Sequence, residues 1–280
     1  MDDCGLNTMK LQINGASIHV LQSAIGAPFG SNPQSAMALV FLHYFGGASR
    51  SWKPVIECLE DDFRCVAPDL RGFGDSDGAQ KDLSVGDAAD DVQALIKKLQ
   101  LKNYALVGHS MGGKIALEVA ARQPRGLHSL VLLAPSPPSP EPMPDSERTR
   151  LMSTHGTRKA ALETLQTITA QPLPSRLFEQ AVEDNLRSSK GAWQAWLECG
   201  SREDISSRMN RIKVPVLVVA SACDEGITSK LLQREVVARI EKSRFCEMPA
   251  AAHLLPLEAP SAVAVLIEKW MASGASDWRC

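Results

Sequence analysis

The sequence predicts an α/β fold with a mainly parallel central sheet. Short runs of apolar and β-branched residues alternate with amphipathic helical patterns along most of the chain, as expected for parallel strands joined by crossover helices. The runs are apolar on both faces, so we expect their strands to be covered on both sides. With 280 residues, 44% of them apolar, the chain has room for one large domain with an insertion or for two domains.

The strands can be placed in order along the chain. The first element is a hairpin at "LQINGASIHVL" (11–21), where Asn14 and Gly15 lie between two alternating runs. An Asn-Gly pair favours a tight hairpin turn, and we expect this hairpin at an edge of the sheet. Six buried parallel strands follow, at 37–43, 63–69, 104–110, 127–134, 214–221 and 244–250.

Helical patterns occupy the gaps between these strands. In 84–100 the apolar residues recur at helical spacing, while aspartates and lysines fall on the opposite face, which is typical of a helix packed on a sheet. The helices are predicted at 51–61, 84–100, 112–124, 229–241 and 260–273.

The alternation of strands and helices is interrupted once. "PSPPSPEPMP" (135–144) holds six prolines in ten residues, which neither a helix nor a central strand accommodates. Residues up to 210 then look helical without strands. We therefore expect a core formed by 1–134 and 211–280, and a helical cap at 135–210 that is entered through a proline-rich linker.

The stretch "GHSMGGK" (108–114) fits two different active sites. Taken through Lys114, it has the spacing of a phosphate-binding loop; taken through Gly112, it is the G-x-S-x-G turn that exposes a nucleophilic serine between a strand and a helix. A phosphate loop needs Ser or Thr after the lysine to hold Mg²⁺, and that position is Ile115. A nucleotide triphosphatase is therefore the weaker interpretation.

The serine interpretation requires a base that takes the serine's proton and an acid that orients the base. Both follow Ser110 in the order acid, then histidine. Asp224 ends the strand "PVLVVASACD", and His253 lies just after the last strand, in "EMPAAAHLLPLEAP". The structural alternatives are a small residue in a tight turn, a helix-capping acid with Glu225 as its substitute, and a core or surface histidine.

At this point the chain resembles the α/β-hydrolase family, in particular its cap-bearing serine esterase branch. The resemblance covers about 36–134 and 211–272 and rests on "LHYFGG", "APDLRGFGDSD", "GHSMGG", "ASACD" and "AAAHLLPLEAP". It implies a nucleophile at Ser110, a general base and then acid at His253, and an orienting acid at Asp224. It also implies an oxyanion hole formed by the backbone N–H groups of Met111 and Phe45.

The sequence departs from the family pattern in the oxyanion loop. The family has glycine after the histidine of this motif, whereas Tyr44 follows His43 here. A side chain at that position restricts the backbone torsions that glycine would allow. Tyr44 is therefore also a candidate for contact with the substrate.

Other residues near these motifs have candidate roles. We list Trp193, Trp196 and Leu254 with Tyr44 as substrate-binding candidates, although aromatics at helical spacing also simply pack a cap against a core. His109 is expected to point away from the serine, and His43 to brace the oxyanion loop. Asp69, Arg71 and Asp75 are expected to be turn and ion-pair residues.

The activity implied is hydrolysis of a small to medium carboxylic ester-like substrate through an acyl-enzyme, without metal or cofactor. The same triad also serves carbon–carbon bond, lactone or thioester hydrolysis and cofactor-free perhydrolysis. A ligand-binding receptor on the hydrolase fold is the non-enzyme alternative, since fold alone does not fix function.

Composition narrows the partners. A formal charge of -2 favours a small-molecule partner over nucleic acid or an anionic membrane. The acidic start "MDDCGLNTMK" is unlike a secretory signal, and no window reaches the roughly 18 apolar residues of a membrane span, so a cytoplasmic protein is expected. The seven cysteines never show C-x-x-C spacing and predict neither a zinc site nor a disulfide framework. Oligomeric state is left open.

Overall fold

The computed structural model describes residues 5–23, 37–78 and 83–278. Their strands form one sheet in the order β1-β2-β4-β3-β5-β6-β7-β8, antiparallel at β1–β2 and β2–β4 and parallel elsewhere. The strands are β1 (Leu6–Ile13), β2 (Ala16–Ser23), β3 (Ala38–Leu42), β4 (Arg64–Pro68), β5 (Tyr104–His109), β6 (Leu127–Leu133), β7 (Val216–Ser221) and β8 (Ser243–Met248). The predicted edge hairpin and the six predicted parallel strands are confirmed.

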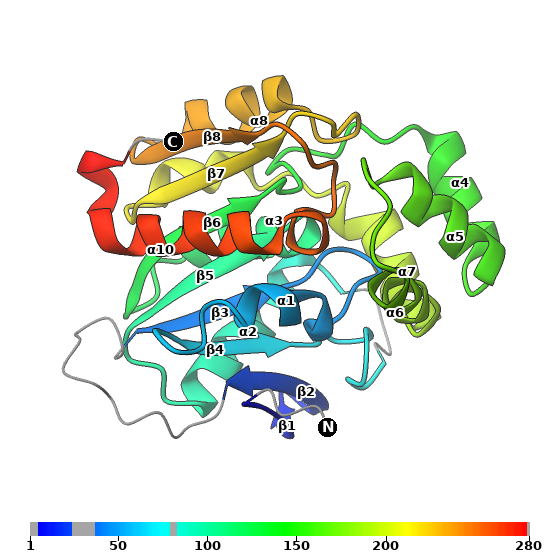
Figure 1. The fold of residues 1–280 in the computed structure, drawn as a ribbon, viewed down its shortest axis with the longest axis horizontal. Coiled ribbons are helices and arrows are strands. Elements are labelled where there is room, and N and C mark those ends of the chain that lie inside the picture. Colours follow the sequence, from blue (N-terminus) through cyan, green and yellow to red (C-terminus); the bar gives the residue numbers. More distant parts are fainter. Residues whose placement is uncertain (1–4, 24–36, 79–82, 279–280) are drawn as a thin grey trace.

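The helices cover both faces of this sheet (Figure 1). They are α1 (Lys53–Ile56), α2 (Val85–Lys98), α3 (Met111–Ala121), α4 (Asp145–Thr154), α5 (Arg158–Thr167), α6 (Ser175–Leu186), α7 (Lys190–Ala195), α8 (Ser229–Glu235), α9 (Leu255–Glu258) and α10 (Pro260–Asp277), with the short turns η2 (Ser49–Trp52), η3 (Trp196–Gly200), η4 (Ser206–Arg211) and η5 (Val237–Arg239). The helix predicted at 51–61 is shorter than expected. Pro54 belongs to the first turn of α1, because a proline without an N–H is tolerated there and not in a helix interior.

Local sequence explains where several elements begin and turn. Asn14 and Gly15 both have positive φ, 45° and 80°, as a two-residue hairpin turn of the I′ type requires. Helix α2 begins with a capping box in which the Ser84 hydroxyl accepts from the N–H of Asp87 and the Asp87 carboxylate accepts from the N–H of Ser84, each at 3.0 Å. These contacts satisfy N–H groups that the first helical turn leaves without partners.

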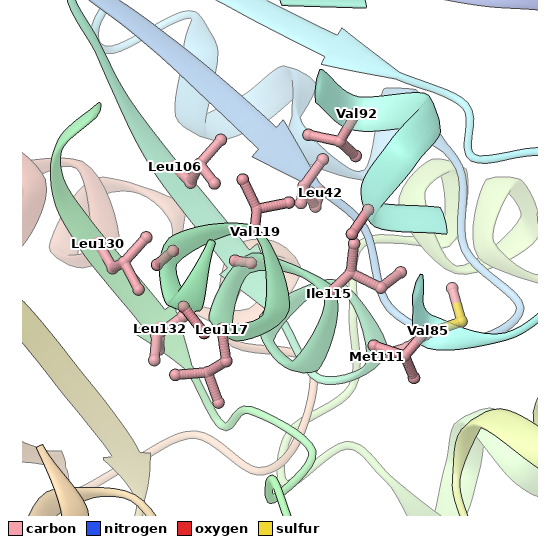
Figure 2. Close-up of a cluster of buried hydrophobic side chains, with 14 of the residues drawn as sticks. Leu42, Val85, Val92, Leu106, Met111, Ile115, Leu117, Val119, Leu130 and Leu132 are labelled. Carbon is pink, nitrogen blue, oxygen red and sulfur yellow. The ribbon is translucent and has the colours of Figure 1, made fainter. Parts of the chain in front are cut away.

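Two buried apolar clusters lie on opposite faces of the sheet. One joins α2 and α3 to β3, β5 and β6, with Val92, Ile115 and Leu106 among its members (Figure 2). The other lies under α1 and α10 and includes Trp52 and Trp270. Every residue of α3 is buried, so this helix, which directly follows the turn at Ser110, is packed on all sides.

The helices α4 to α7 lie between β6 and β7 in the chain and add no strand to the sheet. They gather at one end of the sheet, on the right of Figure 1. The segments that lead to and from them run side by side, because the N–H of Glu141 donates to the carbonyl of Ser201 and the N–H of Ile205 donates to that of Pro138, both at 2.8 Å. This helical segment therefore leaves the core and returns to it at one place.

The helices and the cysteines can be compared with the expectations from composition. Within the described ranges, no helix combines the length and apolarity needed to cross a bilayer. Cys246, on β8, is disulfide-bonded, a pairing that the scattered spacing of the cysteines gave no reason to expect.

Candidate active site

Ser110 lies in a strained turn between β5 and α3. Its φ of 52° and ψ of -117° belong to a region that glycine adopts readily and other residues seldom do. The turn is tight on both sides: a Cβ on Gly108 would come 2.6 Å from the carbonyl oxygen of Gly112, and one on Gly112 would come 2.3 Å from that of Leu42. These glycines allow the strand and helix to approach closely enough to force Ser110 into this conformation.

The three residues predicted to act together lie in hydrogen-bond contact. His253 Nε2 is 2.9 Å from Ser110 Oγ, and His253 Nδ1 is 2.6 Å from Asp224 Oδ2. The other oxygen of Asp224 accepts from the N–H groups of Gly226 and Ile227, each at 2.9 Å. With Asp224 ionised, Nδ1–H donates to it and Nε2 is left to accept from the serine hydroxyl.

The charges of this group reinforce that arrangement. Burial alone would raise the pKa of Asp224, but His253 and the hydrogen bonds to the carboxylate lower it to about 2. Burial alone would lower the pKa of His253, yet Asp224 raises it above its usual value. The carboxylate therefore stays ionised and stabilises a proton on the imidazole.

The two predicted oxyanion donors flank Ser110. Met111 is the first residue of α3 and Phe45 lies in the loop after β3. Among the described residues, neither backbone N–H donates a hydrogen bond within the protein. Tyr44 is not one of the described non-glycine residues with positive φ, so this tyrosine does not need the torsions that glycine would provide.

His43 holds this loop from beneath. Its Nε2 accepts from the N–H of Leu70 at 3.0 Å, which leaves Nδ1–H to donate to the carbonyl of Tyr44 at 2.8 Å. Burial lowers the pKa of His43, so the neutral ring keeps this pattern. The bracing role expected of His43 is in agreement with these contacts.

Asp69 connects the segments that contain Ser49, Asp75 and His19. Its carboxylate accepts from the N–H groups of Ser49 and Asp75, at 2.6 and 2.8 Å, and lies 2.9 Å from His19 Nδ1. Burial opposes its ionisation, but these bonds lower its pKa to about 2. Among the described residues, His19, Asp69 and Asp75 form a set of potential metal ligands whose side-chain atoms are close enough to share one ion. Because Asp69 is already engaged and Asp75 pairs with Arg187, their contacts favour a structural role.

A cavity of about 570 Å³ opens at Ser110 and His253, between the sheet end and the helical segment. The candidates Tyr44, Trp193 and Trp196 line it. The ring of Phe45 also lines it, with its centroid 4.2 Å from that of Trp193. The rings of these four residues therefore form an aromatic part of the cavity wall.

Other predicted residues lie away from the cavity. Leu254 is fully buried in an apolar cluster with Val182 and Leu257 and is not among the described cavity-lining residues. His109 Nε2 lies 2.7 Å from the carbonyl of His253 and supports that residue's backbone. Arg71 pairs with Asp91 at 2.7 Å.

Lys114 lies in the first turns of α3 and is fully buried. Its Nζ donates to the backbone carbonyls of Glu203, at 2.6 Å, and Ser139, at 3.3 Å. Burial lowers its pKa to about 8. The amine is thus occupied by the chain itself and does not face a phosphate cradle.

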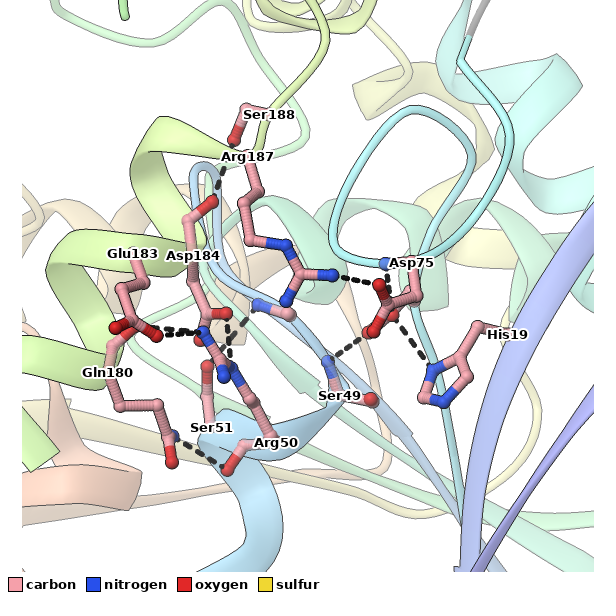
Figure 3. Close-up of polar contacts among 12 residues, drawn as sticks. His19, Ser49, Arg50, Ser51, Asp75, Gln180, Glu183, Asp184, Arg187 and Ser188 are labelled. Carbon is pink, nitrogen blue, oxygen red and sulfur yellow. Dashed lines mark hydrogen bonds and ion pairs between the residues drawn. The ribbon is translucent and has the colours of Figure 1, made fainter. Parts of the chain in front are cut away.

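A buried ion pair, which the motifs do not indicate, joins α6 to the residues after the oxyanion loop (Figure 3). Arg50 Nε donates to Asp184 Oδ1 at 2.5 Å, and Gln180 Nε2 donates to the carbonyl of Arg50 at 3.2 Å. Asp184 is fully buried, and burial raises its pKa to about 7 despite the guanidinium. Nearby, Arg187 pairs with Asp75, so α6 contacts two loops of the core.

Two cavity residues were also missed by sequence reasoning. Glu141 is an acid within the proline-rich stretch, and Asn185 is at the end of α6; both line the cavity. A Cβ on Gly46 would come 2.8 Å from the Asn185 amide nitrogen, so this amide lies against the oxyanion loop. An acid among prolines was a usable signal for Glu141, whereas Asn185 carried none.

Comparisons with known proteins agree with this architecture. A family model described as "alpha/beta hydrolase fold" matches residues 38–184, more than half of the chain. The chain is 28% identical over 244 residues to "Putative carbamate hydrolase RutD" of Agrobacterium fabrum, covering 82% of this chain and 91% of the relative. It is 29% identical over 254 residues to "Putative non-heme bromoperoxidase BpoC" of Mycobacterium tuberculosis, covering 84% and 94%.

Solved structures show the same fold. An esterase from Exiguobacterium antarcticum superposes with a TM-score of 0.84 at 21% identity, covering 95% of this chain and all of the esterase. Carboxylesterase CesB from Bacillus subtilis superposes with a TM-score of 0.80 at 19% identity, covering 96% of this chain and 92% of that one. The chain therefore belongs to the alpha/beta hydrolase fold family.

Proposed function

We propose that this protein is a serine hydrolase that cleaves small to medium carboxylic ester-like substrates through an acyl-enzyme on Ser110. The observation that carries the proposal is the contact chain from Ser110 Oγ to His253 Nε2, 2.9 Å, and from His253 Nδ1 to Asp224, 2.6 Å, at the base of a cavity. A serine so placed has the base and the orienting acid that an alcohol nucleophile needs.

The reaction proceeds in two halves. His253 takes the proton of Ser110 as its oxygen attacks the ester carbonyl, and the N–H groups of Phe45 and Met111 stabilise the oxyanion. His253 then protonates the departing alcohol, which leaves an acyl group on Ser110. Water, deprotonated by His253, attacks this acyl group and releases the acid.

The cavity and the helices above it support a substrate of modest size. A volume of about 570 Å³ is in the range of cavities that enclose small organic molecules. We propose that 135–210 act as a cap on a core of 1–134 and 211–280, with Trp193 and Trp196 packing against the substrate. A small-molecule partner and a cytoplasmic location remain predictions from the sequence.

The test is covalent labelling combined with activity. A fluorophosphonate probe is expected to label the wild type at Ser110, and Ser110→Ala is expected to lose the label and to lower p-nitrophenyl butyrate hydrolysis by about 10⁴-fold or more. Ser153→Ala, at an exposed position on α4, is the matched control and should keep both. Labelling at another serine, or undiminished hydrolysis by Ser110→Ala, would overturn the proposal.

The names of the relatives and structural neighbours span carbamate hydrolase, bromoperoxidase and enol-lactonase, and the fold alone does not choose between these reactions for this chain. A panel of esters, lactones, thioesters, carbamates and 1,3-diketones, measured as kcat/KM, ranks these chemistries for this chain. Turnover slower than ligand dissociation for every member of the panel would favour the receptor alternative.

A further inference from the structure

The cavity wall is acidic. Among the residues that the structure describes, no lysine or arginine lines it, whereas four acids do: Glu141, Glu147, Asp224 and Glu225. Asp224 is engaged by the imidazole, and Glu147 is held by Arg150 through two contacts of 2.7 and 2.8 Å. Among the described residues, Glu141 and Glu225 form no ion pair.

Glu141 is presented to the cavity by a fixed backbone. Its N–H donates to the carbonyl of Ser201 at 2.8 Å, and its own carbonyl accepts from Arg148 at 3.4 Å. The side chain therefore extends from a segment that is anchored on both sides. Among the described residues its carboxylate belongs to no ion pair.

The nearest cations do not neutralise Glu141 by contact. Lys114 donates to two backbone carbonyls, at 2.6 and 3.3 Å, and Arg148 donates to that of Leu197 at 2.8 Å. Neither side chain lines the cavity. Burial raises the pKa of Glu141, while a side-chain hydrogen bond with Ser136 and the more distant charges of Lys114, Arg148 and His253 lower it. A partly buried carboxylate without a contacting counter-ion favours a cationic ligand and disfavours an anionic one.

We propose that this cavity selects substrates by charge: it favours esters that carry a cationic nitrogen, which Glu141 receives, and disfavours esters that carry a carboxylate. The inference rests on the proposed function, because it names the substrate class of the same site. An ammonium group is the matching ligand because it carries the opposite charge and, when it has N–H groups, supplies donors to an acceptor-only carboxylate.

The test compares matched esters at pH 8. One series varies the acyl chain of a p-nitrophenyl ester: pentanoate, 5-(trimethylammonio)pentanoate and the adipate monoester. The second varies the alcohol: butyrylcholine against its uncharged isostere 3,3-dimethylbutyl butyrate. In at least one series, kcat/KM is expected to be at least tenfold higher for the cationic ester than for its uncharged partner, mainly because KM is lower. Within the acyl series, kcat/KM is expected to be lowest for the adipate monoester.

Glu141→Gln is expected to reduce this preference at least fivefold. Glu241→Gln, an exposed acid in the turn before β8, is the control and should leave it unchanged. The proposal is overturned if the wild type hydrolyses the uncharged esters without charge preference in either series, or if the preference survives Glu141→Gln in a protein with unchanged melting temperature. If Glu141→Gln does not fold, the wild-type preference decides.

A failure of the proposed function gives a different result. In that case the wild type hydrolyses none of the esters, the uncharged ones included. Calorimetric titration with the unreactive methyl ketone analogues of the acyl series then decides the charge preference by itself. Equal or tighter binding of the carboxylate analogue would overturn the inference.

Discussion

The strained backbone at Ser110 predicts that the protein is more stable with glycine than with alanine at this position. Ser110 has φ 52° and ψ -117°, and holding a non-glycine residue in such a region costs about 1–3 kcal/mol. Ser110→Gly releases this strain, whereas Ser110→Ala keeps the Cβ and the strain with it. Against this gain, glycine adds about 0.4–1 kcal/mol of unfolded-state entropy.

The difference leaves Ser110→Gly more stable than Ser110→Ala by about 1 kcal/mol, within a range of about 0–2.6 kcal/mol. At about 2–4 °C per kcal/mol for a chain of this size class, the melting temperature should rise by a few degrees. Urea unfolding followed by circular dichroism measures the free energy, and scanning calorimetry measures the melting temperature. Both variants lack the Ser110 hydroxyl, so they differ only in the Cβ atom.

The control pair is Ser153→Gly and Ser153→Ala, at an exposed position of helix α4. There the order reverses, because glycine in a helix costs about 0.5–1 kcal/mol relative to alanine. The reasoning is refuted if Ser110→Gly is no more stable than Ser110→Ala while the Ser153 pair shows the ordinary helical order. Strain at the elbow would then contribute nothing measurable to stability.

Three further predictions follow from the same contacts. Arg50→Gln leaves the fully buried carboxylate of Asp184 without its cation and should lower the free energy of unfolding by about 3 kcal/mol at pH 8. The loss should shrink at pH 5, because Asp184, whose pKa is raised to about 7, takes up a proton there. The control Arg158→Gln removes an exposed ion pair and should cost less than about 1 kcal/mol at both pH values. The proposed base, His253, must be neutral to act, and its pKa is raised, so kcat/KM for a p-nitrophenyl ester should fall as pH drops, with a midpoint above the unperturbed value of about 6.5; a midpoint below it would contradict the assignment. Gly112→Ala places a Cβ 2.3 Å from a backbone oxygen and should cost several kcal/mol in urea unfolding, while Gly78→Ala, 3.6 Å from its nearest neighbour, should be nearly neutral.

The sheet and the elbow could be predicted because their signals are local. The β-branched runs mark buried strands, and the glycines around Ser110 mark a turn that only small residues permit. Chain order then indicated Asp224 and His253, since parallel strands end at one edge of the sheet. The structure brings these three side chains into contact, although their chemical roles still require the labelling experiment.

The remaining features depend on contacts between distant residues. Arg50 and Asp184 are 134 positions apart, and a single ion pair leaves no periodic pattern in the sequence. Leu254 follows His253 directly, but its side chain lies in an apolar cluster with residues of α5 and α6, just before α9 begins. A residue that adjoins His253 in the sequence therefore does not line the cavity with it.

The side chain of Lys114 connects both ends of the helical segment to α3. One amine is bonded to the segment that leaves the core, at Ser139, and to the segment that returns, at Glu203. Both ends of the helical segment are therefore tied to α3, the helix that follows Ser110, which fixes where this segment begins and ends relative to that serine.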